Sequence, residues 1–252
     1  LERKVTRMTV SNATPQRLYL LQLSTSAIPL GGGRTLAMVS AAYLVAMSNG
    51  SYILIDSGLP ADYAQPGSPP AQNEKNVLAH LTELGLAPKY IDVVIATHFD
   101  VDHVGYHDAF PDAEFVVQRR HMESARGGDP RYAIVRAHWD HPALRYRLVD
   151  GDCELFPGLF LIESSGHAPG HQSVLVLLPK SGPVLLAIDA VVMQYLFTPE
   201  RQAWQTDDNE AELRASTRKL LDLVTSEGVN LVVFGHDGTQ WQTLVKARAY
   251  YE

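Results

Sequence analysis

The sequence predicts an α/β protein built as a single domain. Short, strand-sized runs of apolar residues alternate along the 252 residues with segments whose apolar residues recur at helical spacing. No linker-like stretch separates two halves of the chain, and no internal repeat is visible. Hydrophobic residues make up 46% of the chain, which is enough for a sizeable core. We therefore expect residues 1–252 to form one domain in which helices cover a central sheet layer.

The predicted strands are apolar runs bounded by turn residues. The pair Asn49-Gly50 lies between two such runs and is a strong hairpin signal. Residues 61–70 are rich in Pro, Gly and Ser and predict a mobile loop. The predicted strands span residues 17–23, 36–47, 52–55, 91–96, 114–117, 159–163, 173–178, 183–188 and 230–234.

Amphipathic segments predict the helices between these strands. Apolar residues fall on one face of a helix over residues 73–84, which Gly85 ends, and His80 lies off that face, where we expect it to be solvated. Residues 127–146 show no clean period and predict an insertion or a lid. Further helices are predicted over residues 119–125, 209–223 and 243–250.

Composition narrows the classes of partner. The formal net charge of −7 disfavours nucleic acid and anionic membranes, so we expect neither as a main partner. No apolar run approaches the ~20 residues that span a bilayer, and the first residues lack the apolar core of a signal peptide. We expect a cytoplasmic protein that is a monomer or a homodimer. Cys153 is the only cysteine and suits a structural thiol in a reducing compartment.

The N-terminus carries a separate expectation. The chain does not begin with Met, so we expect part of residues 1–16 to be disordered or an addition to the natural chain, with Met8 as a plausible natural start.

The most informative segment follows the predicted strand over residues 91–96. Residues 97–105 have the sequence Thr-His-Phe-Asp-Val-Asp-His-Val-Gly, which places two imidazoles and two carboxylates in one short loop. Charged groups withdrawn from water need partners, and a metal ion suits both residue types. The pattern therefore predicts metal ligands among His98, Asp100, Asp102 and His103.

Three later sites also place His or Asp at the end of a predicted strand or just beyond it. They contain His167 with His171, Asp189, and His236. Loops at one edge of a layered α/β fold converge, so these side chains are expected to meet the first loop. A lone His is more often a structural hydrogen-bonding group, whereas four such sites in this order favour one metal centre.

These motifs resemble the metallo-β-lactamase superfamily, whose hallmark is His-x-His-x-Asp-His followed by Gly and then by a distant His, Asp and His. The resemblance extends over residues 43–237, and Asp56-Ser57-Gly58 corresponds to the family's Asp-Thr-Gly segment. Within the superfamily the chain is most similar to the N-acyl homoserine lactone lactonases. The supporting segments are Val-Gln-Arg at 117–119, Gly-His-Ala-Pro-Gly-His-Gln-Ser at 166–173, Leu-Ala-Ile-Asp-Ala at 186–190 and Phe-Gly-His-Asp at 234–237.

The resemblance implies a four-layer αβ/βα sandwich that holds two divalent metal ions. The ions would be Zn²⁺ in preference to Mn²⁺ or iron, given the mixture of carboxylates and imidazoles. A hydroxide held between the ions would open a lactone or a similar small cyclic ester, with Asp102 as the proton shuttle. The implied ligands are His98, Asp100 and His167 for one ion, Asp102, His103 and His236 for the other, and Asp189 as a bridge.

Asp100 departs from the family pattern, because it stands where the family has its second His. A carboxylate adds negative charge and favours harder metals, so a diiron redox or oxygen-handling protein of the same fold is an alternative function. A hydrolase of another small ester or amide is a further alternative. His107 is an alternative ligand, because it lies four residues after His103.

Val192 is the second departure, since the lactonases have a substrate-contacting Tyr three residues after the bridging Asp. Tyr195, three positions further on, is the candidate replacement and completes the predicted catalytic pair with Asp102. The remaining histidines are given structural roles. We expect His171 to support the site by hydrogen bonds, and we expect His121, His138 and His141 to lie on the surface or in the lid.

Overall fold

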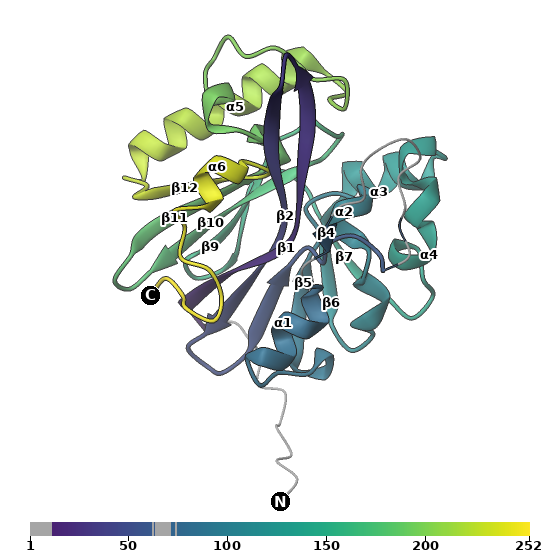
Figure 1. Ribbon diagram of the computed structural model, residues 1–252. Coiled ribbons are helices and arrows are strands. Elements are labelled where there is room, and N and C mark those ends of the chain that lie inside the picture. The colour runs from purple at the N-terminus through teal and green to yellow at the C-terminus, as the bar shows by residue number, and fades with distance from the viewer. Residues whose placement is uncertain (1–11, 62, 64–71, 74) are drawn as a thin grey trace, which may run out of the picture.

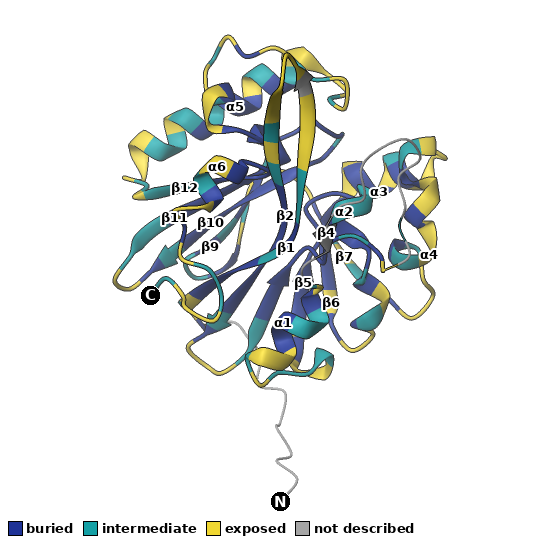
Figure 2. Ribbon diagram, viewed as in Figure 1, coloured by how far each residue is buried: buried dark blue, intermediate teal, exposed yellow. Residues whose placement is uncertain are grey.

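Two β-sheets face each other and helices cover their outer sides (Figure 1). The computed structural model describes residues 12–61, 63, 72–73 and 75–252. The predicted loop over residues 61–70 and the expected N-terminal addition therefore fall largely outside the described residues. Burial is concentrated in the strands, and the exposed residues lie on the outer faces of the helices, in the turns and at the far end of the β1–β2 pair (Figure 2).

The first sheet has seven strands in the order β4-β1-β2-β3-β5-β6-β7. Pairing is antiparallel from β4 to β3 and parallel from β3 to β7. The predicted Asn49-Gly50 turn joins β2 to β3, with Gly50 at a φ of 83°. The strands are β1 (Pro15–Gly31), β2 (Arg34–Met47), β3 (Tyr52–Ile55), β4 (Gln72–Asn73), β5 (Ile91–Ile95), β6 (Glu114–Gln118) and β7 (Arg145–Val149).

The second sheet has five strands in the order β12-β11-β10-β9-β8. Its strands pair antiparallel except for β11 and β12, which run parallel. The strands are β8 (Cys153–Phe156), β9 (Leu159–Glu163), β10 (Gln172–Leu178), β11 (Gly182–Ile188) and β12 (Leu231–Phe234).

Helices and short helical turns fill the connections between strands. Asn209 caps the longest helix, where its side chain accepts a hydrogen bond from the Glu212 backbone N–H at 3.1 Å. The α-helices are α1 (Val77–Glu83), α2 (Val101–Val104), α3 (Arg119–Arg126), α4 (Arg136–Trp139), α5 (Glu210–Ser226) and α6 (Gly238–Trp241). The 3₁₀ turns are η1 (Pro88–Tyr90), η2 (His107–Ala109), η3 (Pro130–Val135), η4 (Asp189–Val191) and η5 (Gln194–Leu196).

Alternation along the strands builds the four layers. In β11, Val184, Leu186 and Ile188 point into the core between the sheets, whereas Leu185 and Ala187 pack beneath Leu220 of α5. The first sheet has the same arrangement, with α1 on its outer face. Strands covered on both faces have continuous apolar sequences, which is why the sequence revealed them. The predicted four-layer αβ/βα sandwich is confirmed.

The predicted strands agree with the structure better than the predicted ends of the chain's helices. Strands β3 and β9 have the predicted bounds. The helix predicted over residues 73–84 begins only at Val77, because Asn73 belongs to β4 and Asn76 caps the helix. The predicted closing helix over residues 243–250 is wrong. That segment instead runs beside β1, where Ala247 donates its backbone N–H to the Leu20 carbonyl.

Two histidine predictions are also wrong. His80 is buried, and its Nε2 lies 2.8 Å from the Gln22 carbonyl oxygen. His121 is fully buried as well, and its Nδ1 lies 2.8 Å from the Pro169 carbonyl oxygen. Each ring lies on the buried face of its helix, and a backbone carbonyl on a neighbouring element gives it a buried partner.

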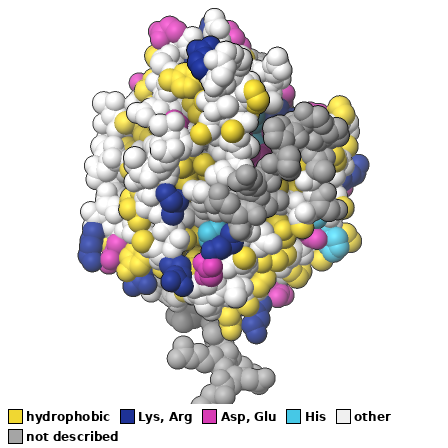
Figure 3. Space-filling view, viewed as in Figure 1, with side chains coloured by type: hydrophobic (Ala, Val, Ile, Leu, Met, Phe, Trp, Pro, Cys, Tyr) yellow, Lys and Arg dark blue, Asp and Glu magenta, His cyan; other side chains and the backbone are white. Residues whose placement is uncertain are grey.

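Residues 127–146 pack onto the protein through their aromatic side chains. Trp139 is buried and stacks on Phe99, with ring centroids 4.8 Å apart. The end of this segment is the start of β7 (Arg145–Val149), a strand that was not predicted because the expected insertion over residues 127–146 divided its alternating sequence. The face seen in Figure 3 carries Lys and Arg side chains interspersed with Asp and Glu. Among the described residues, no helix is long and apolar enough to cross a membrane.

Candidate metal centre

The predicted ligands lie just beyond the ends of strands from both sheets. His98 and Asp100 follow β5, and His167 lies in the loop between β9 and β10. Asp189 directly follows β11 and His236 follows β12. The expected convergence of these loops is confirmed, because imidazole and carboxylate atoms from all of them lie within 4.8 Å of one another in three overlapping groups.

Backbone geometry close to the site is unusual. Asp56 and Ile188 are the non-glycine residues with a left-handed φ among those described, at 58° and 52°. Gly235 allows the chain before His236 to pass the end of β11, because a Cβ there would lie 2.5 Å from the Ile188 carbonyl oxygen. Strained backbone of this kind is retained where the surrounding structure fixes it, often at functional sites.

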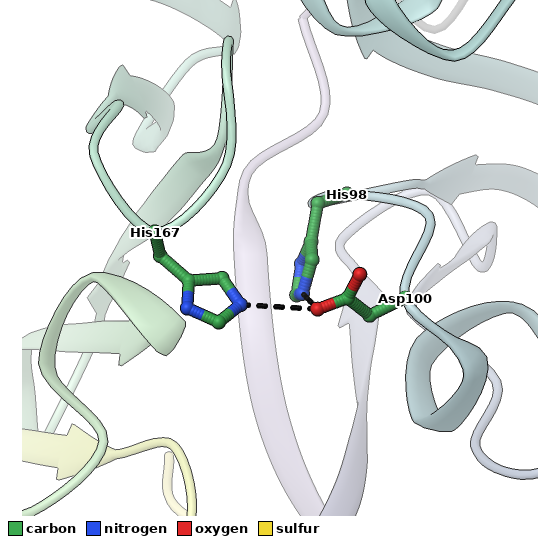
Figure 4. Close-up of side chains that lie close together, drawn as sticks. All are labelled: His98, Asp100 and His167. Carbon is green, nitrogen blue, oxygen red and sulfur yellow. Dashed lines mark hydrogen bonds and ion pairs between the residues drawn. The ribbon is translucent and has the colours of Figure 1, made fainter. Parts of the chain in front are cut away.

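The first group contains His98, Asp100 and His167 (Figure 4). Asp100 Oδ2 lies 3.4 Å from His98 Nε2 and 3.1 Å from His167 Nε2. All three residues are largely buried. The two imidazoles and the carboxylate point toward one another, as the sequence predicted for these residues.

The second group contains Asp102, His103 and His236. Asp102 Oδ2 lies 3.7 Å from His103 Nε2 and 3.6 Å from His236 Nε2. Asp102 is the most accessible member, with a quarter of its side chain (25%) exposed.

Asp189 lies between the two groups. Its Oδ1 is 3.6 Å from His103 Nε2, and its Oδ2 is 3.0 Å from His236 Nε2 and 3.4 Å from His167 Nε2. Oδ2 thus lies near histidines of both groups and Oδ1 near the second group, which is the position of a bridging ligand.

Each histidine of the site is oriented by a hydrogen bond at Nδ1, which directs its Nε2 into the site. The partners are Thr97 Oγ1 for His98, Asp56 Oδ2 for His103, Asp207 Oδ1 for His167 and the Val39 carbonyl for His236, at 2.7–3.0 Å. Such outer partners fix the tautomer and orientation of metal-binding imidazoles. Asp56 was recognised from the sequence only as part of a family segment, and Asp207 was not predicted, because a supporting carboxylate does not reveal its partner in the sequence.

The carboxylates give the site a strongly negative potential. Burial lowers the pKa of His103, but Asp102, Asp189 and Asp56 outweigh it and raise that pKa well above its usual range. Burial also opposes the shifts of His167 and His236, yet their carboxylate partners raise both pKa values to about 9. His98 differs, because burial and the nearby His103 hold its pKa well below the usual value. The negative potential of these carboxylates would stabilise a bound divalent cation.

The donor atoms fit a metal ion in spacing and in accessibility. Ligands at 2.0–2.1 Å in a tetrahedral arrangement are ~3.3 Å apart, and the spacings here run from 3.0 to 4.0 Å. The buried atoms His98 Nε2, His103 Nε2 and Asp189 Oδ1 have no hydrogen-bond partner. Buried polar atoms without partners are rare, and a cation would satisfy all three.

Arg131 enters the first group, which the sequence did not predict. Its Nε and Nη2 donate to the two oxygens of Asp100 at 2.6 and 2.5 Å, and Nη2 also lies 2.7 Å from His167 Nε2. Arg131 belongs to η3, in the segment that showed no clean sequence period.

The alternative candidates lie outside these groups. His107 is fully buried against Phe115 and belongs to none of the metal groups found among the described residues. His171 plays the expected supporting part, since its Nε2 accepts the Asp189 backbone N–H at 3.2 Å. Val192 is buried, and Tyr195 is 62% exposed on the turn that follows Asp189.

Comparison with known proteins decides the family. Residues 36–236 match the model of the family described as the metallo-beta-lactamase superfamily. The chain belongs to the metallo-beta-lactamase superfamily. The recognition made from the sequence motifs is therefore confirmed.

The superfamily relatives that resemble this chain include several lactonases. The N-acyl homoserine lactonase AttM of Azorhizobium caulinodans is 33% identical over 192 residues, which cover 73% of this chain and 72% of that protein. The N-acyl homoserine lactonase AiiA of Bacillus thuringiensis subsp. kurstaki is 30% identical over 219 residues, which cover 81% of this chain and 84% of that protein.

Solved structures within the superfamily agree. A quorum-quenching N-acyl homoserine lactone lactonase superposes with a TM-score of 0.84 at 27% identity, covering 95% of this chain and 100% of that one. An N-acyl homoserine lactone hydrolase with N-hexanoyl-L-homoserine bound at its catalytic metal centre gives a TM-score of 0.82 at 25% identity, covering 94% and 100%. Both neighbours are hydrolases, in line with the hydrolytic function predicted from the sequence.

Proposed function

We propose that the protein is a metal-dependent hydrolase that opens the ring of a lactone, and that this substrate resembles an N-acyl homoserine lactone. The observation that carries this is the convergence of all seven predicted ligands into groups joined by one buried carboxylate, Asp189. The relatives named as N-acyl homoserine lactonases support the same reaction class. Quorum quenching would then be the biological outcome.

Two divalent ions are the proposed cofactors, with Zn²⁺ favoured by the mixture of imidazoles and carboxylates and with Mn²⁺ or iron as alternatives. When bound, such ions polarise a carbonyl and make hydroxide available from water near neutral pH. The proposed ligands are His98, Asp100 and His167 for the first position, Asp102, His103 and His236 for the second, and Asp189 for both.

Asp102 is the proposed proton shuttle. It is the most exposed of the three carboxylates among the proposed ligands, and no Lys or Arg of the described chain pairs with it, so it can receive a proton and pass it to a leaving alkoxide. Replacing Asp102 with Asn preserves shape but removes the base. We expect lactone kcat/KM to fall by roughly 10²- to 10⁴-fold. Steady-state kinetics with metal content measured on the same sample checks this, and full activity in metal-loaded Asp102→Asn protein contradicts the assignment.

Tyr195 is the proposed contact to the substrate carbonyl. It would take the role of the Tyr that the lactonases have at the position of Val192. Its side chain is exposed, so this role requires the turn over η5 to fold onto the bound substrate. A Tyr195→Phe variant should then raise KM for the lactone, whereas unchanged kinetics would remove Tyr195 from the site.

A panel of lactones tests the function as a whole. Metal-loaded protein is assayed for ring opening of homoserine lactones with short and long acyl chains, simple γ- and δ-lactones, and linear esters and amides. Turnover of acyl homoserine lactones above the other compounds supports the proposal. Turnover confined to linear esters or amides supports the alternative hydrolase, and no lactone turnover in the presence of active control enzymes contradicts the lactonase function.

The alternative function, a diiron redox protein, is supported by one observation. Asp100 lies in the first group, and a carboxylate favours harder metals. Elemental analysis of natively expressed protein separates the two functions, since zinc without iron excludes the redox alternative.

We also propose a cytoplasmic location, which the single half-buried thiol of Cys153 suits, and a monomer or homodimer, which analytical ultracentrifugation distinguishes.

A further inference from the structure

The Arg131 side chain, which is always positively charged, contacts two of the ligand residues of the first metal position. The Arg131 guanidinium holds both oxygens of Asp100 and contacts His167 Nε2 (2.5–2.7 Å). Asp100 Oδ2 and His167 Nε2 are the atoms that face each other across the first group in Figure 4. Arg131 therefore uses two of the three donor atoms that a metal ion would need there.

The second position has no such competitor. Asp102 and Asp189 form ion pairs only with histidines among the described residues. Arg201 pairs with Asp207 and acts on Asp189 only beyond ion-pair distance. The buried donors His103 Nε2 and Asp189 Oδ1 have no hydrogen-bond partner at all. The two positions thus differ in what a metal ion must displace.

We propose that Arg131 makes the two metal positions unequal, so that one divalent ion binds tightly at Asp102, His103, His236 and Asp189, and the first position fills only when Arg131 is displaced. This rests on the ligand set of the proposed function. It assigns Arg131 a role that follows from Asp100, because a bidentate carboxylate partner is what a guanidinium fork matches and a second histidine would not provide.

Charge and geometry make the competition direct. A guanidinium stays protonated throughout the range in which proteins fold, so Arg131 cannot vacate the position by losing a proton. It also repels a divalent ion placed among the same donors. The structure offers Arg131 a second place to bind, because its Nη1 already donates to Asp208 Oδ1 and to the His167 carbonyl, each at 2.9 Å. The Asp208 side chain is 39% exposed, so this second anchor lies at the edge of the site.

Zinc titration of the metal-free full-length protein tests the proposal. Isothermal titration calorimetry, with bound zinc counted after dialysis, is applied to the wild type, Arg131→Met and Arg136→Met. Methionine keeps the length of the side chain and removes the charge. Arg136 is the matched control, because it also holds a carboxylate, Asp140, through Nε and Nη2 in the same part of the chain, and it belongs to neither metal group.

The wild type and Arg136→Met should each show one tight zinc and a second that is weaker by roughly tenfold or more. Arg131→Met should bind two tight zinc ions. Two tight zinc ions of equal affinity in the wild type, or a second site that stays weak in a folded Arg131→Met protein, would overturn the proposal.

Folding of each variant is checked by circular dichroism and thermal melting. If Arg131→Met does not fold, the wild-type titration still decides, because equal affinities contradict the proposal and unequal affinities support it. No zinc binding in any variant would instead contradict the proposed metal-dependent function.

Discussion

At the scale of single residues, Asp56 shows how a side chain that lies outside the ligand set can organise it. Its Oδ1 accepts the Thr97 backbone N–H, and its Oδ2 accepts from the Thr97 hydroxyl and from His103 Nδ1 at 2.7–2.9 Å. Burial raises the pKa of Asp56, while its contacts with His103 and Thr97 oppose that shift. One buried carboxylate thus connects the end of β3 to the metal loop.

Substitution of Asp56 by Asn isolates this orienting role, because Asn tolerates the left-handed backbone at φ 58° but has only one acceptor oxygen. Its NH2 group must then face either the Thr97 backbone N–H or the donors on the Oδ2 side, so the three hydrogen bonds cannot all be kept. We expect zinc affinity to fall by roughly 10- to 100-fold. Competition with a chelating dye measures this. Asp150→Asn is the matched control, since Asp150 pairs with Arg119 on the surface. Equal affinities for the two variants would show that Asp56 does not support the site.

The residues that could be predicted were those whose own type carries the chemistry. His98, Asp102, His103 and Asp189 stand out because imidazoles and carboxylates at strand ends are costly without a partner. Arg131 could not be predicted, because its meaning comes from Asp100, which is 31 positions away in sequence and meets it only in the folded chain. Asp207 likewise gains its role from a distant ring, that of His167.

At the scale of elements, the loop after β9 and the start of α5 are packed so closely that glycine is required. Gly166 has a φ of 130°, and a Cβ there would lie 2.2 Å from the Leu213 backbone nitrogen. The Gly166 carbonyl also accepts the Asn209 backbone N–H at 2.8 Å, just before α5. His167 therefore takes its position partly from the packing of a helix that contributes no ligand.

Replacing Gly166 with Ala should lower the free energy of unfolding by roughly 2–4 kcal/mol, because the methyl group meets backbone that cannot move aside. Gly228→Ala is the control, since Gly228 also has a positive φ, 59°, but open space around its Cα. That change should cost only about 1 kcal/mol. Urea denaturation of the metal-free proteins measures both, and equal losses would show that the contact with α5 does not constrain the loop.

Elements were predictable where one local pattern determined them. The strands covered on both faces, such as β3 and β9, are continuous apolar runs and were recovered with their bounds. The segment over residues 243–250 has helical spacing, yet pairing with β1 satisfies its backbone instead. A tertiary contact of this kind overrides a short helical pattern.

At the scale of the whole molecule, the fold buries more histidines than the metal groups use. Burial lowers the pKa of His107 to about 3 and, opposed by a hydrogen bond to the Pro169 carbonyl, lowers the pKa of His121 to about 4. His107 is the more costly to protonate, because neither of its ring nitrogens has a hydrogen-bond partner. Both rings are held neutral within the core.

These two rings should make the metal-free protein sensitive to acid. An unfolded histidine takes up a proton near pH 6.5, whereas His107 and His121 do so in the folded state only near pH 3 and 4. Between those values the unfolded state binds more protons, so stability is fully present above about pH 6.5 and falls as the pH is lowered, by about 1.4 kcal/mol per pH unit for each ring.

Urea denaturation from pH 7 to pH 4.5 measures the slope of stability against pH. His107→Leu should remove one ring's share of it, while His141→Leu, on the exposed surface, should leave the slope unchanged. The same slope in both variants would mean that His107 does not couple folding to protons.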